Sequence, residues 1–266
     1  MPLFSIITVC YNAGKTLGRT LESIDSQTCK NYEHIVVDGA SSDGTLDVIA
    51  AHPNALRRHV SEPDKGLYDA MNKGMGLAKG KYLIFLNAGD KFHSPETLAA
   101  IAATAKAHGT PAIIYGDTDI VDMEGRYLGP RHLLAPAKLT LNSFAQGMLV
   151  CHQAFIPLKR ITGFYSMKYR YSADYEWCIR CLHHARKTVK VEGESLVDYL
   201  NEGLTSSNRM ASLLERFKIM TYYYGFFPTL FRHIGFIGRY ARRRMAQGRG
   251  DRRATSDDNK DKKCIS

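Results

Sequence analysis

Several familiar sequence signatures are absent from this 266-residue chain. Neither the dinucleotide-binding pattern GxGxxG nor the phosphate-loop pattern GxxxxGK(S/T) occurs, which argues against a dinucleotide dehydrogenase and an NTPase. The first segment, MPLFSIITVCYN, has no basic leader and no cleavage site, and the six cysteines show no paired framework. We therefore expect a reduced protein in the cytoplasm.

The chain also lacks a zinc-type arrangement of cysteine and histidine. Cys178 and Cys181 form a CxxC motif, but no second pair stands at the spacing of a zinc site. A redox CxxC is expected after a strand, whereas this one lies in a helical pattern. We predict that both cysteines pack in the core.

Most of the chain has no excess of one charge, although the formal net charge is +10. Residues 1–218 hold 25 basic and 22 acidic side chains, whereas residues 219–266 hold 11 basic and 4 acidic ones. The basic character therefore belongs to the C-terminal segment. Nucleic-acid binding by the main body has little support from this distribution.

No uninterrupted apolar run is long enough for a membrane-spanning helix, which takes about 20 residues. The aromatic stretch 219–237 is broken by Pro228, Arg232 and His233, and four arginines follow between positions 239 and 244. We interpret residues 206–245 as a helical, basic and aromatic segment on an anionic membrane surface. A helix packed on the main domain is the alternative. Residues 246–266 are predicted to be a disordered tail.

Short apolar runs followed by polar loops dominate the first half of the chain. Phe4–Cys10, Tyr32–Val37 and the first part of Tyr82–Asp90 are rich in β-branched and aromatic residues, as expected for buried strands. The segment after the first strand has Leu17 and Leu21 on one helical face. We predict an α/β fold with a mixed, mainly parallel sheet flanked by helices.

Polar and acidic side chains follow these strands. Asp38 and Asp43 lie in the loop DGASSDGT, and Asn87 and Asp90 lie in NAGD. Because ligands of open α/β sheets bind at the carboxyl ends of strands, Asp38 is placed to accept from a base or a ribose hydroxyl. A well-capped turn would explain Asp43 but not Asp38, and Asp90 alone could also mark a turn.

The segment SEPDKGLYDAMNKG leads into a predicted helix that begins at Leu67. Its polar residues Asp69, Asn72 and Lys73 lie three or four positions apart and share one face. A solvated helix face would explain this spacing. Asn72 and the Pro-Asp-Lys-Gly loop are poor helix formers, which favours a functional role.

The middle of the chain contains two further polar patterns. An Asp-x-Asp pair at positions 117 and 119 could bind a metal, but alternating acids are common on an exposed hairpin, and we place the metal elsewhere. Gly147–Ile156 is predicted to be a strand. Within it, His152 and Gln153 need polar partners, and sugar hydroxyls would serve.

Four motifs occur in a characteristic order, namely ITVCYN, VVDGASSDGT, DKGLYDAMNKG and FLNAGD. Together they resemble the family 2 glycosyltransferases of the GT-A fold. The resemblance implies a GT-A domain at residues 1–205 that transfers a sugar from a nucleotide-sugar donor with inversion. It also implies a role in bacterial surface polysaccharide synthesis.

The resemblance assigns residues to the donor and to a metal. The metal-binding Asp-x-Asp of the family falls on Asn87-Ala88-Gly89-Asp90, where both expected acids are replaced. We predict that Asp90 and the donor diphosphate hold Mn²⁺ or Mg²⁺, since hard cations take oxygen ligands. The predicted donor-binding residues are Thr8, Tyr11, Asp38, Asp43, Asp69, Asn72, Lys73 and Asn87.

Asp174 matches the Asp of the family's Glu-Asp motif, although Ala173 replaces the Glu. Displacement at the anomeric carbon requires one carboxylate to take the proton of the acceptor hydroxyl, and we assign that role to Asp174. Glu176 is the competing base. Both acids could instead simply favour the first turn of a helix. The predicted acceptor-binding residues are His152, Gln153, Tyr175, Glu176 and Trp177.

The expected protein is an inverting glycosyltransferase that moves a sugar from a UDP-sugar to a glycan or a lipid-linked acceptor. It would work at the cytoplasmic face of the membrane without nucleic acid. One alternative is a sugar nucleotidyltransferase, which is expected to show a Gly-rich loop near the N-terminus. Another is a non-catalytic protein that binds nucleotide sugars at the membrane.

Overall fold

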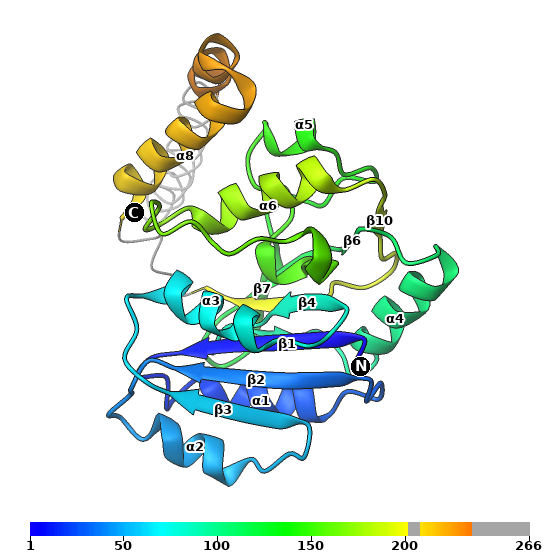
Figure 1. The fold of residues 1–266 in the computed structure, drawn as a ribbon, viewed down its shortest axis with the longest axis vertical. Coiled ribbons are helices and arrows are strands. Elements are labelled where there is room, and N and C mark those ends of the chain that lie inside the picture. The colour runs from blue at the N-terminus through cyan, green and yellow to red at the C-terminus, as the bar shows by residue number, and fades with distance from the viewer. Residues whose placement is uncertain (202–207, 236–266) are drawn as a thin grey trace, which may run out of the picture. The chain divides into compact units, whose positions relative to one another are not determined.

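The computed structural model describes residues 1–201 and 208–235. A sheet with the strand order β3-β2-β1-β4 lies at the centre of the main unit (Figure 1). All three pairings in this sheet are parallel, as the continuous apolar runs predicted. Its strands are β1 Phe4–Cys10, β2 Tyr32–Asp38, β3 Arg57–Ser61 and β4 Tyr82–Phe85.

A second sheet continues from the edge of the first, because Tyr82 of β4 forms an antiparallel bridge with Leu158. Its order is β10-β6-β9, and a third sheet has the order β5-β11-β7-β8. These mixed pairings confirm the predicted sheet type. The strands are β5 Lys91–Phe92, β6 Ile113–Tyr115, β7 Thr118–Val121, β8 Tyr127–Pro130, β9 Phe155–Pro157, β10 Thr188–Lys190 and β11 Val197–Leu200.

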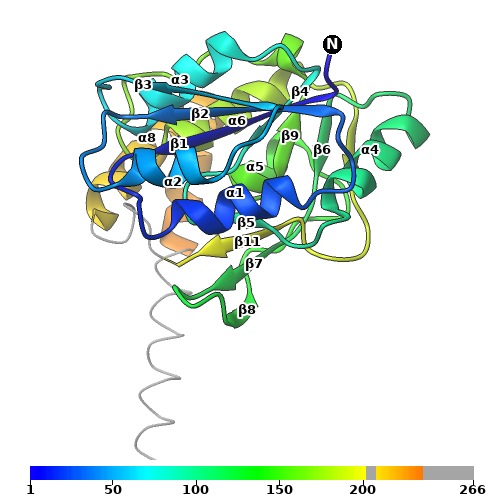
Figure 2. The same ribbon diagram turned by 90° about the horizontal axis from the view of Figure 1, so that it is seen from below.

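Helices cover both faces of the central sheet. Helix α3 lies on one face, and α1 and α2 lie on the other (Figure 2). Leu17 and Leu21 of α1 are fully buried against Cys10 and Val36, so the predicted amphipathic face is confirmed. The bounds are α1 Leu17–Asp25, α2 Thr45–Ala51 and α3 Leu67–Leu77.

Further helices follow the strands of the central sheet along the chain. They are α4 Thr97–Ala107, α5 Leu141–Phe144, α6 Ala173–His184 and α8 Arg209–Tyr224, with 3₁₀ turns η1 His152–Ala154 and η2 Lys159–Ile161. Cys178 and Cys181 lie buried within α6, as predicted.

The predicted strand Gly147–Ile156 is wrong. Residues 152–154 form the turn η1, and the strand β9 begins only at Phe155 and pairs with β6. The apolar side chains of this run are buried although much of the backbone is irregular. The Gln153 side chain is held there by hydrogen bonds with Cys151 and Asp90. Strands β7 and β8 form an antiparallel hairpin, which carries Asp119 of the Asp-x-Asp pair.

Contacts divide the chain into two compact units, Met1–Arg216 and Phe217–Ser266. The predicted domain boundary at residue 205 and the predicted tail at 246–266 lie outside the described residues. In the second unit, Phe226, Phe227 and Phe231 are 50%, 68% and 70% exposed. Among the helices that the structure describes, none is long and apolar enough to cross a membrane.

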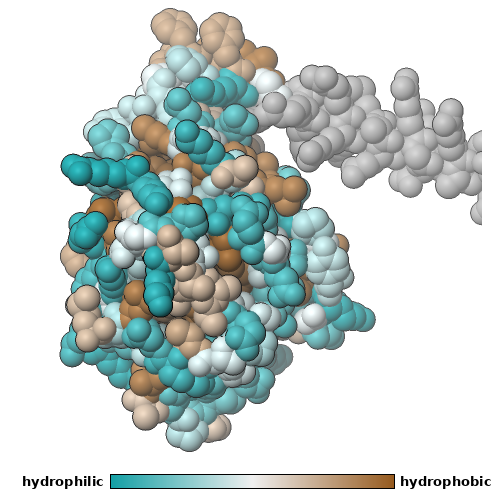
Figure 3. Space-filling model, turned by 90° about the vertical axis from the view of Figure 1, so that its right-hand side faces the viewer, coloured by the Kyte–Doolittle hydropathy of each residue, from teal (hydrophilic) through white to brown (hydrophobic). Residues whose placement is uncertain are grey.

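The face of the molecule drawn in Figure 3 shows mainly hydrophilic residues over the main unit, with apolar residues scattered among them. Scattered apolar residues are normal on a protein surface.

Candidate active site

Asp38 ends β2 and lies fully buried at the carboxyl edge of the central sheet. Its Oδ2 accepts hydrogen bonds from the Ser41 N–H at 3.0 Å and the Ser61 hydroxyl at 2.6 Å, and its Oδ1 accepts from the Ser41 hydroxyl. Burial by itself raises the pKa of Asp38, but these hydrogen bonds outweigh it and lower the pKa. The carboxylate is therefore ionised at neutral pH and fixed in place.

The loop after β1 faces the loop after β2. Tyr11 is 67% exposed, and a Cβ on Gly39 would lie 3.2 Å from the Tyr11 ring. Asp43 joins the loops, since it accepts hydrogen bonds from the N–H groups of Gly14 at 3.0 Å and Thr45 at 3.1 Å. Hydrogen bonds from Thr45 and Gly14 lower the pKa of Asp43. Asp43 thus shapes the loops, and Tyr11 leaves a ring face open for a planar ligand.

Thr8 lies inside the sheet rather than at its edge. It is fully buried, and its hydroxyl lies 3.0 Å from Nε2 of His34. The predicted contact of Thr8 with the donor stays a prediction, and the buried position of Thr8 does not support it.

Asn72 of α3 holds a loop from the second half of the chain. Its Nδ2 donates to the Tyr165 carbonyl at 3.0 Å, and its Oδ1 accepts from the Tyr165 N–H at 2.7 Å. This amide pairing fixes the position of Tyr165. The amide of Asn72 is therefore occupied by the protein itself.

The two charged residues on the same helix hold the loop that precedes it. Lys73 contacts Glu62 at 2.9 Å and donates to the Pro63 carbonyl at 2.8 Å, and the Glu62 contact raises the pKa of Lys73. Asp69 accepts a hydrogen bond from the Lys65 N–H at 3.0 Å. The motif DKGLYDAMNKG thus builds a rigid loop and helix start, and direct contacts from these two side chains to a donor stay predictions.

In the NAGD segment, Asn87 has an unpaired side-chain oxygen, whereas both carboxylate oxygens of Asp90 accept hydrogen bonds. Asn87 Oδ1 is buried, and no hydrogen-bond partner for it exists among the described residues. Asp90 is buried, its Oδ2 accepts from Gln153 Nε2 at 2.8 Å, and its Oδ1 accepts from the Leu200 N–H at 3.0 Å. Burial raises the pKa of Asp90 to about 7. A cation at Asp90 would have to displace these hydrogen bonds.

His152 and Gln153 share one turn but differ in their partners. Gln153 is buried between Asp90 and Cys151, whose thiol donates to Gln153 Oε1 at 2.7 Å. His152 is buried against Phe85, and its Nε2 has no partner in the described part of the chain. Burial lowers the pKa of His152, and the nearby Asp174 opposes this. His152 is therefore a neutral imidazole with an unused nitrogen beside Asp174.

Asp174 lies in the first turn of α6 and is half-buried. Its Oδ1 accepts hydrogen bonds from the Tyr68 hydroxyl at 3.1 Å and from the Tyr175 N–H at 2.8 Å. In the described ranges 1–201 and 208–235, no donor reaches its Oδ2. One oxygen of this carboxylate is anchored, and the other is open.

The three residues after Asp174 turn into the interior. Trp177 is fully buried and donates from Nε1 to the Gly163 carbonyl at 2.8 Å. Tyr175 is buried and donates to the Phe144 carbonyl, and Glu176 is buried beside Arg180 at 3.2 Å. The expectation that these side chains contact an acceptor is not supported, because they offer it no exposed ring face. Both oxygens of Glu176 accept hydrogen bonds from Arg180, whereas one oxygen of Asp174 has no donor among the described residues.

Tyr68, whose hydroxyl donates to Asp174, also forms part of the wall of a cleft of about 540 Å³, although Asp174 itself does not line this cleft. Lys65 and Arg170 bring two positive charges to this cleft. Positive charge beside an open carboxylate suits a reaction in which a phosphate group leaves while a hydroxyl loses its proton. The cleft is lined by Lys65, Gly66, Leu67, Tyr68, Met167, Tyr169, Arg170, Tyr171 and Asn208.

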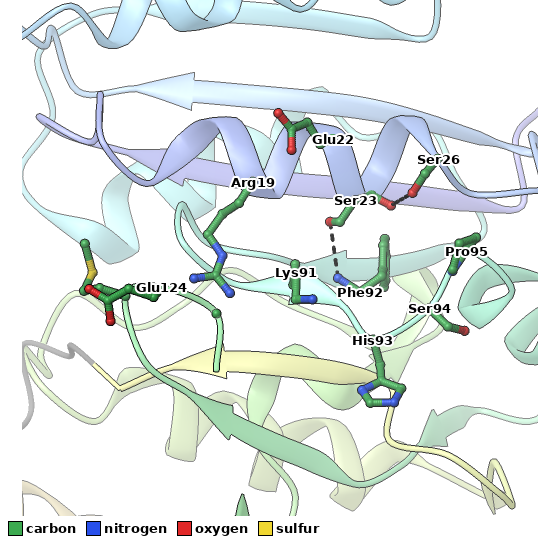
Figure 4. Close-up of a pocket in the computed structure, with 12 residues that line it drawn as sticks. Arg19, Glu22, Ser23, Ser26, Lys91, Phe92, His93, Ser94, Pro95 and Glu124 are labelled. Atoms are coloured by element: carbon green, nitrogen blue, oxygen red, sulfur yellow. Dashed lines mark hydrogen bonds between the residues drawn. The ribbon is translucent and has the colours of Figure 1, made fainter. Parts of the chain in front are cut away.

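A second groove of about 550 Å³ lies between α1, β5 and the turn of the β7–β8 hairpin. Figure 4 shows Arg19, Lys91 and His93 extending into it. His93 Nδ1 lies 2.7 Å from Asp198 and 3.8 Å from Asp119, and ligand atoms of these three residues lie within 4.8 Å of one another. This set could hold a divalent cation, although Lys91 already pairs with Asp198 at 3.0 Å.

Residues 5–161 match the sequence profile of the family described as Glycosyl transferase family 2. This chain belongs to that family. A PGL/p-HBAD biosynthesis glycosyltransferase of Mycobacterium bovis (strain BCG / Pasteur 1173P2) is 36% identical over 186 residues, which are 68% of this chain and 70% of the relative. An uncharacterized glycosyltransferase of Mycobacterium tuberculosis (strain ATCC 25618 / H37Rv) is 32% identical over 184 residues, or 67% and 68% of the two chains.

Two solved structures have a similar fold. The S. aureus TarS 1-349 complex with UDP-GlcNAc has a TM-score of 0.67 at 18% identity and covers 89% of this chain and 73% of that one. The mannosyltransferase PcManGT from Pyrobaculum calidifontis, in complex with GDP-Man and Mn²⁺, has a TM-score of 0.56 at 18% identity and covers 82% and 63%. The predicted GT-A fold and the predicted glycosyltransferase class are confirmed.

Sequence reasoning missed four residues that shape this glycosyltransferase site. Ser41 and Ser61 hold Asp38, and Lys65 and Arg170 line the cleft that includes Tyr68. Ser41 and Lys65 lie inside recognised motifs and could have been singled out. Ser61 begins the segment SEPDKGLYDAMNKG, but only the fold brings it to Asp38, and Arg170 carries no local signal.

Proposed function

We propose that this protein is an inverting glycosyltransferase in which Asp174 is the catalytic base. The observation that carries the proposal is the Oδ2 of Asp174, which accepts no hydrogen bond among the described residues, together with a positively charged cleft that shares Tyr68 with Asp174. Oδ2 takes the proton of the acceptor hydroxyl as its oxygen attacks the anomeric carbon. The bond from that carbon to the diphosphate breaks on the opposite face, so the configuration inverts.

The donor in this proposal is a UDP-sugar. Asp38 accepts from the base, the ring of Tyr11 covers it, and Lys65 and Arg170 stabilise the departing diphosphate. Support comes from the buried, ionised Asp38 at a strand end and from the UDP and UDP-GlcNAc in the TarS complexes. The unused Oδ1 of Asn87 and Nε2 of His152 would bind polar groups of the two sugars.

A divalent cation, Mn²⁺ or Mg²⁺, stays part of the proposal as an aid to the leaving group, and Mn²⁺ accompanies GDP-Man in the PcManGT complex. Asp90 fits such a cation poorly, because both of its oxygens are occupied in the interior. The cluster His93, Asp119 and Asp198 has the better ligand set, but its His93 lines the groove beside α1 and not the cleft that holds Lys65 and Arg170.

The acceptor is proposed to be a glycan or a lipid-linked glycan at the inner face of the membrane, in surface polysaccharide synthesis. One relative is named for PGL/p-HBAD biosynthesis, which supports an acceptor of the cell surface. The exposed phenylalanines of the second unit support contact with lipid.

The test is release of nucleoside diphosphate from UDP-, GDP- and dTDP-sugars, with Mn²⁺ or EDTA, with and without bacterial lipid extract. We expect acceptor-stimulated release from UDP-sugars that falls at least 100-fold in Asp174→Asn, since general bases contribute about 10²–10⁴ in rate. Glu176→Gln is the matched control and should retain most of the activity. Retained turnover in Asp174→Asn, with loss in Glu176→Gln, would reverse the assignment of the base.

A further inference from the structure

Tyr68 is the second residue of α3, and it links that helix to the start of α6. It is 6% exposed and forms part of the wall of the cleft that holds Lys65 and Arg170. Its hydroxyl donates to Asp174 Oδ1 at 3.1 Å, across 106 positions of the sequence. The hydroxyl thus reaches the base from a separate element of the fold.

The ring of Tyr68 is held by a stack of aromatic side chains. Tyr68 stacks on Tyr165 at 5.4 Å between centroids, and Tyr165 stacks on Trp177 at 4.9 Å. Phe85 packs edge-on against Tyr165 and Trp177 at 5.3 and 5.6 Å. Such ring pairs have preferred geometries, so the stack fixes where the Tyr68 hydroxyl points.

The hydroxyl of Tyr68 remains a donor over the working pH range, because burial and the negative charge of Asp174 raise the pKa of Tyr68. Together with the Tyr175 N–H it occupies Oδ1 of Asp174. Two donors on one oxygen set the plane of the carboxylate and leave Oδ2 as the atom that meets the acceptor.

We propose that Tyr68 is a positioning residue for the catalytic base: its hydroxyl anchors Oδ1 of Asp174 so that Oδ2 is aimed at the acceptor hydroxyl. The inference rests on the proposed function. In the step it serves, the acceptor O–H bond breaks and its proton goes to Oδ2. The freed electron pair forms the new bond to the anomeric carbon, and the diphosphate leaves with the pair of the old bond.

Tyr165 provides a matched control for Tyr68. Its hydroxyl is buried and has no partner among the residues that the structure describes. Tyr68→Phe and Tyr165→Phe each remove one hydroxyl from the same stack, but only the first removes a contact to Asp174. If only the aromatic stack mattered, Tyr68→Phe and Tyr165→Phe would change the activity equally.

The separation of kcat from KM distinguishes positioning from a merely structural role. The Tyr68 hydroxyl acts on the step in which Asp174 takes the proton of the acceptor hydroxyl. Its loss in Tyr68→Phe should lower kcat about three- to tenfold and leave the KM for the acceptor within about twofold of the wild-type value.

Both constants are measured for the full-length wild type, Tyr68→Phe and Tyr165→Phe with the donor at saturation. Tyr165→Phe should stay within about twofold of the wild-type kcat. An unchanged kcat in a folded Tyr68→Phe overturns the proposal, and so does an equal loss of kcat in Tyr165→Phe. Full activity of Asp174→Asn would instead refute the proposed function, which distinguishes the two failures.

A second measurement does not depend on turnover. Thermal unfolding of Tyr68→Phe, Asp174→Ala and the double variant tests whether the hydrogen bond exists in solution. Tyr68→Phe should lower the midpoint by about 2–4 °C with Asp174 present, and should leave it unchanged or raise it when combined with Asp174→Ala. Equal effects of Tyr68→Phe with and without Asp174→Ala would overturn the proposal.

Discussion

The carboxylate of Asp90 lies in the interior with both oxygens hydrogen-bonded, and burial raises its pKa to about 7. In the unfolded chain this carboxyl group titrates near its ordinary pKa of 3.8. Between these values the folded protein binds a proton that the unfolded chain does not, so the contribution of Asp90 to stability falls as pH rises from about 4 to about 7.

Asp90→Asn removes this titration. The free energy of unfolding should then depend less on pH, and the difference between pH 5 and pH 8 should shrink by about 1–3 kcal/mol. Urea unfolding at both pH values measures it, with the exposed Asp47→Asn as the control. A larger pH difference in Asp90→Asn than in the wild type would contradict the argument.

Helix α3 approaches the central sheet through Gly74. A Cβ at Gly74 would lie 2.5 Å from the Cγ2 of Ile7 in β1, whereas a Cβ at Gly76 would meet no atom within 4 Å. Both glycines lie in the same helix, which allows a matched comparison. Because α3 carries Tyr68 and Asn72, its distance from the sheet also sets the position of Asp174.

Gly74→Ala should lower the free energy of unfolding by about 1–3 kcal/mol, since an added methyl group overpacks the contact with β1. Gly76→Ala should raise it by about 0.5–1 kcal/mol, because alanine favours a helix. Denaturant unfolding of both variants measures the two effects. Equal stability of the two variants would show that α3 does not pack through Gly74.

The whole molecule combines a polar main unit with a second unit that exposes aromatic side chains. Residues 219–266 hold 11 basic and 4 acidic residues, a composition that suits anionic lipid. Phe227 and Phe231 are well exposed in this unit, and Phe164 is comparably exposed, at 59%, in the main unit. Aromatic and basic residues together favour binding at a membrane surface.

We expect the full chain to float with anionic liposomes and to dissociate as salt is raised, because the basic residues supply part of the attraction. Phe227→Glu/Phe231→Glu should weaken binding at least about fivefold, whereas Phe164→Glu should leave it unchanged. Flotation with and without about 0.5 M salt compares the variants. Unchanged binding of the double variant would place the lipid contact elsewhere.

The sequence by itself determined the strands β1, β2 and β4, the helices α1 and α3, and the position of the two acids that carry the proposal. Apolar runs predict buried strands, and strand ends predict where Asp38 lies, because these signals are local in the chain. The order of the motifs was enough to indicate the GT-A fold and the family, which the comparisons confirm. The position of Asp174 in the first turn of α6 also follows from local pattern.

Only the tertiary structure decided which of the polar residues are open to a ligand. Asp90 accepts hydrogen bonds from Gln153 and Leu200, which lie 63 and 110 positions away in the sequence. The Tyr68 hydroxyl donates to Asp174 across 106 positions. The sequence around Trp177 would look the same whether its side chain faced a sugar or the core. In the fold this side chain is buried. Local periodicity cannot distinguish these cases, because long-range packing decides which side chains the protein satisfies itself and which remain for a substrate.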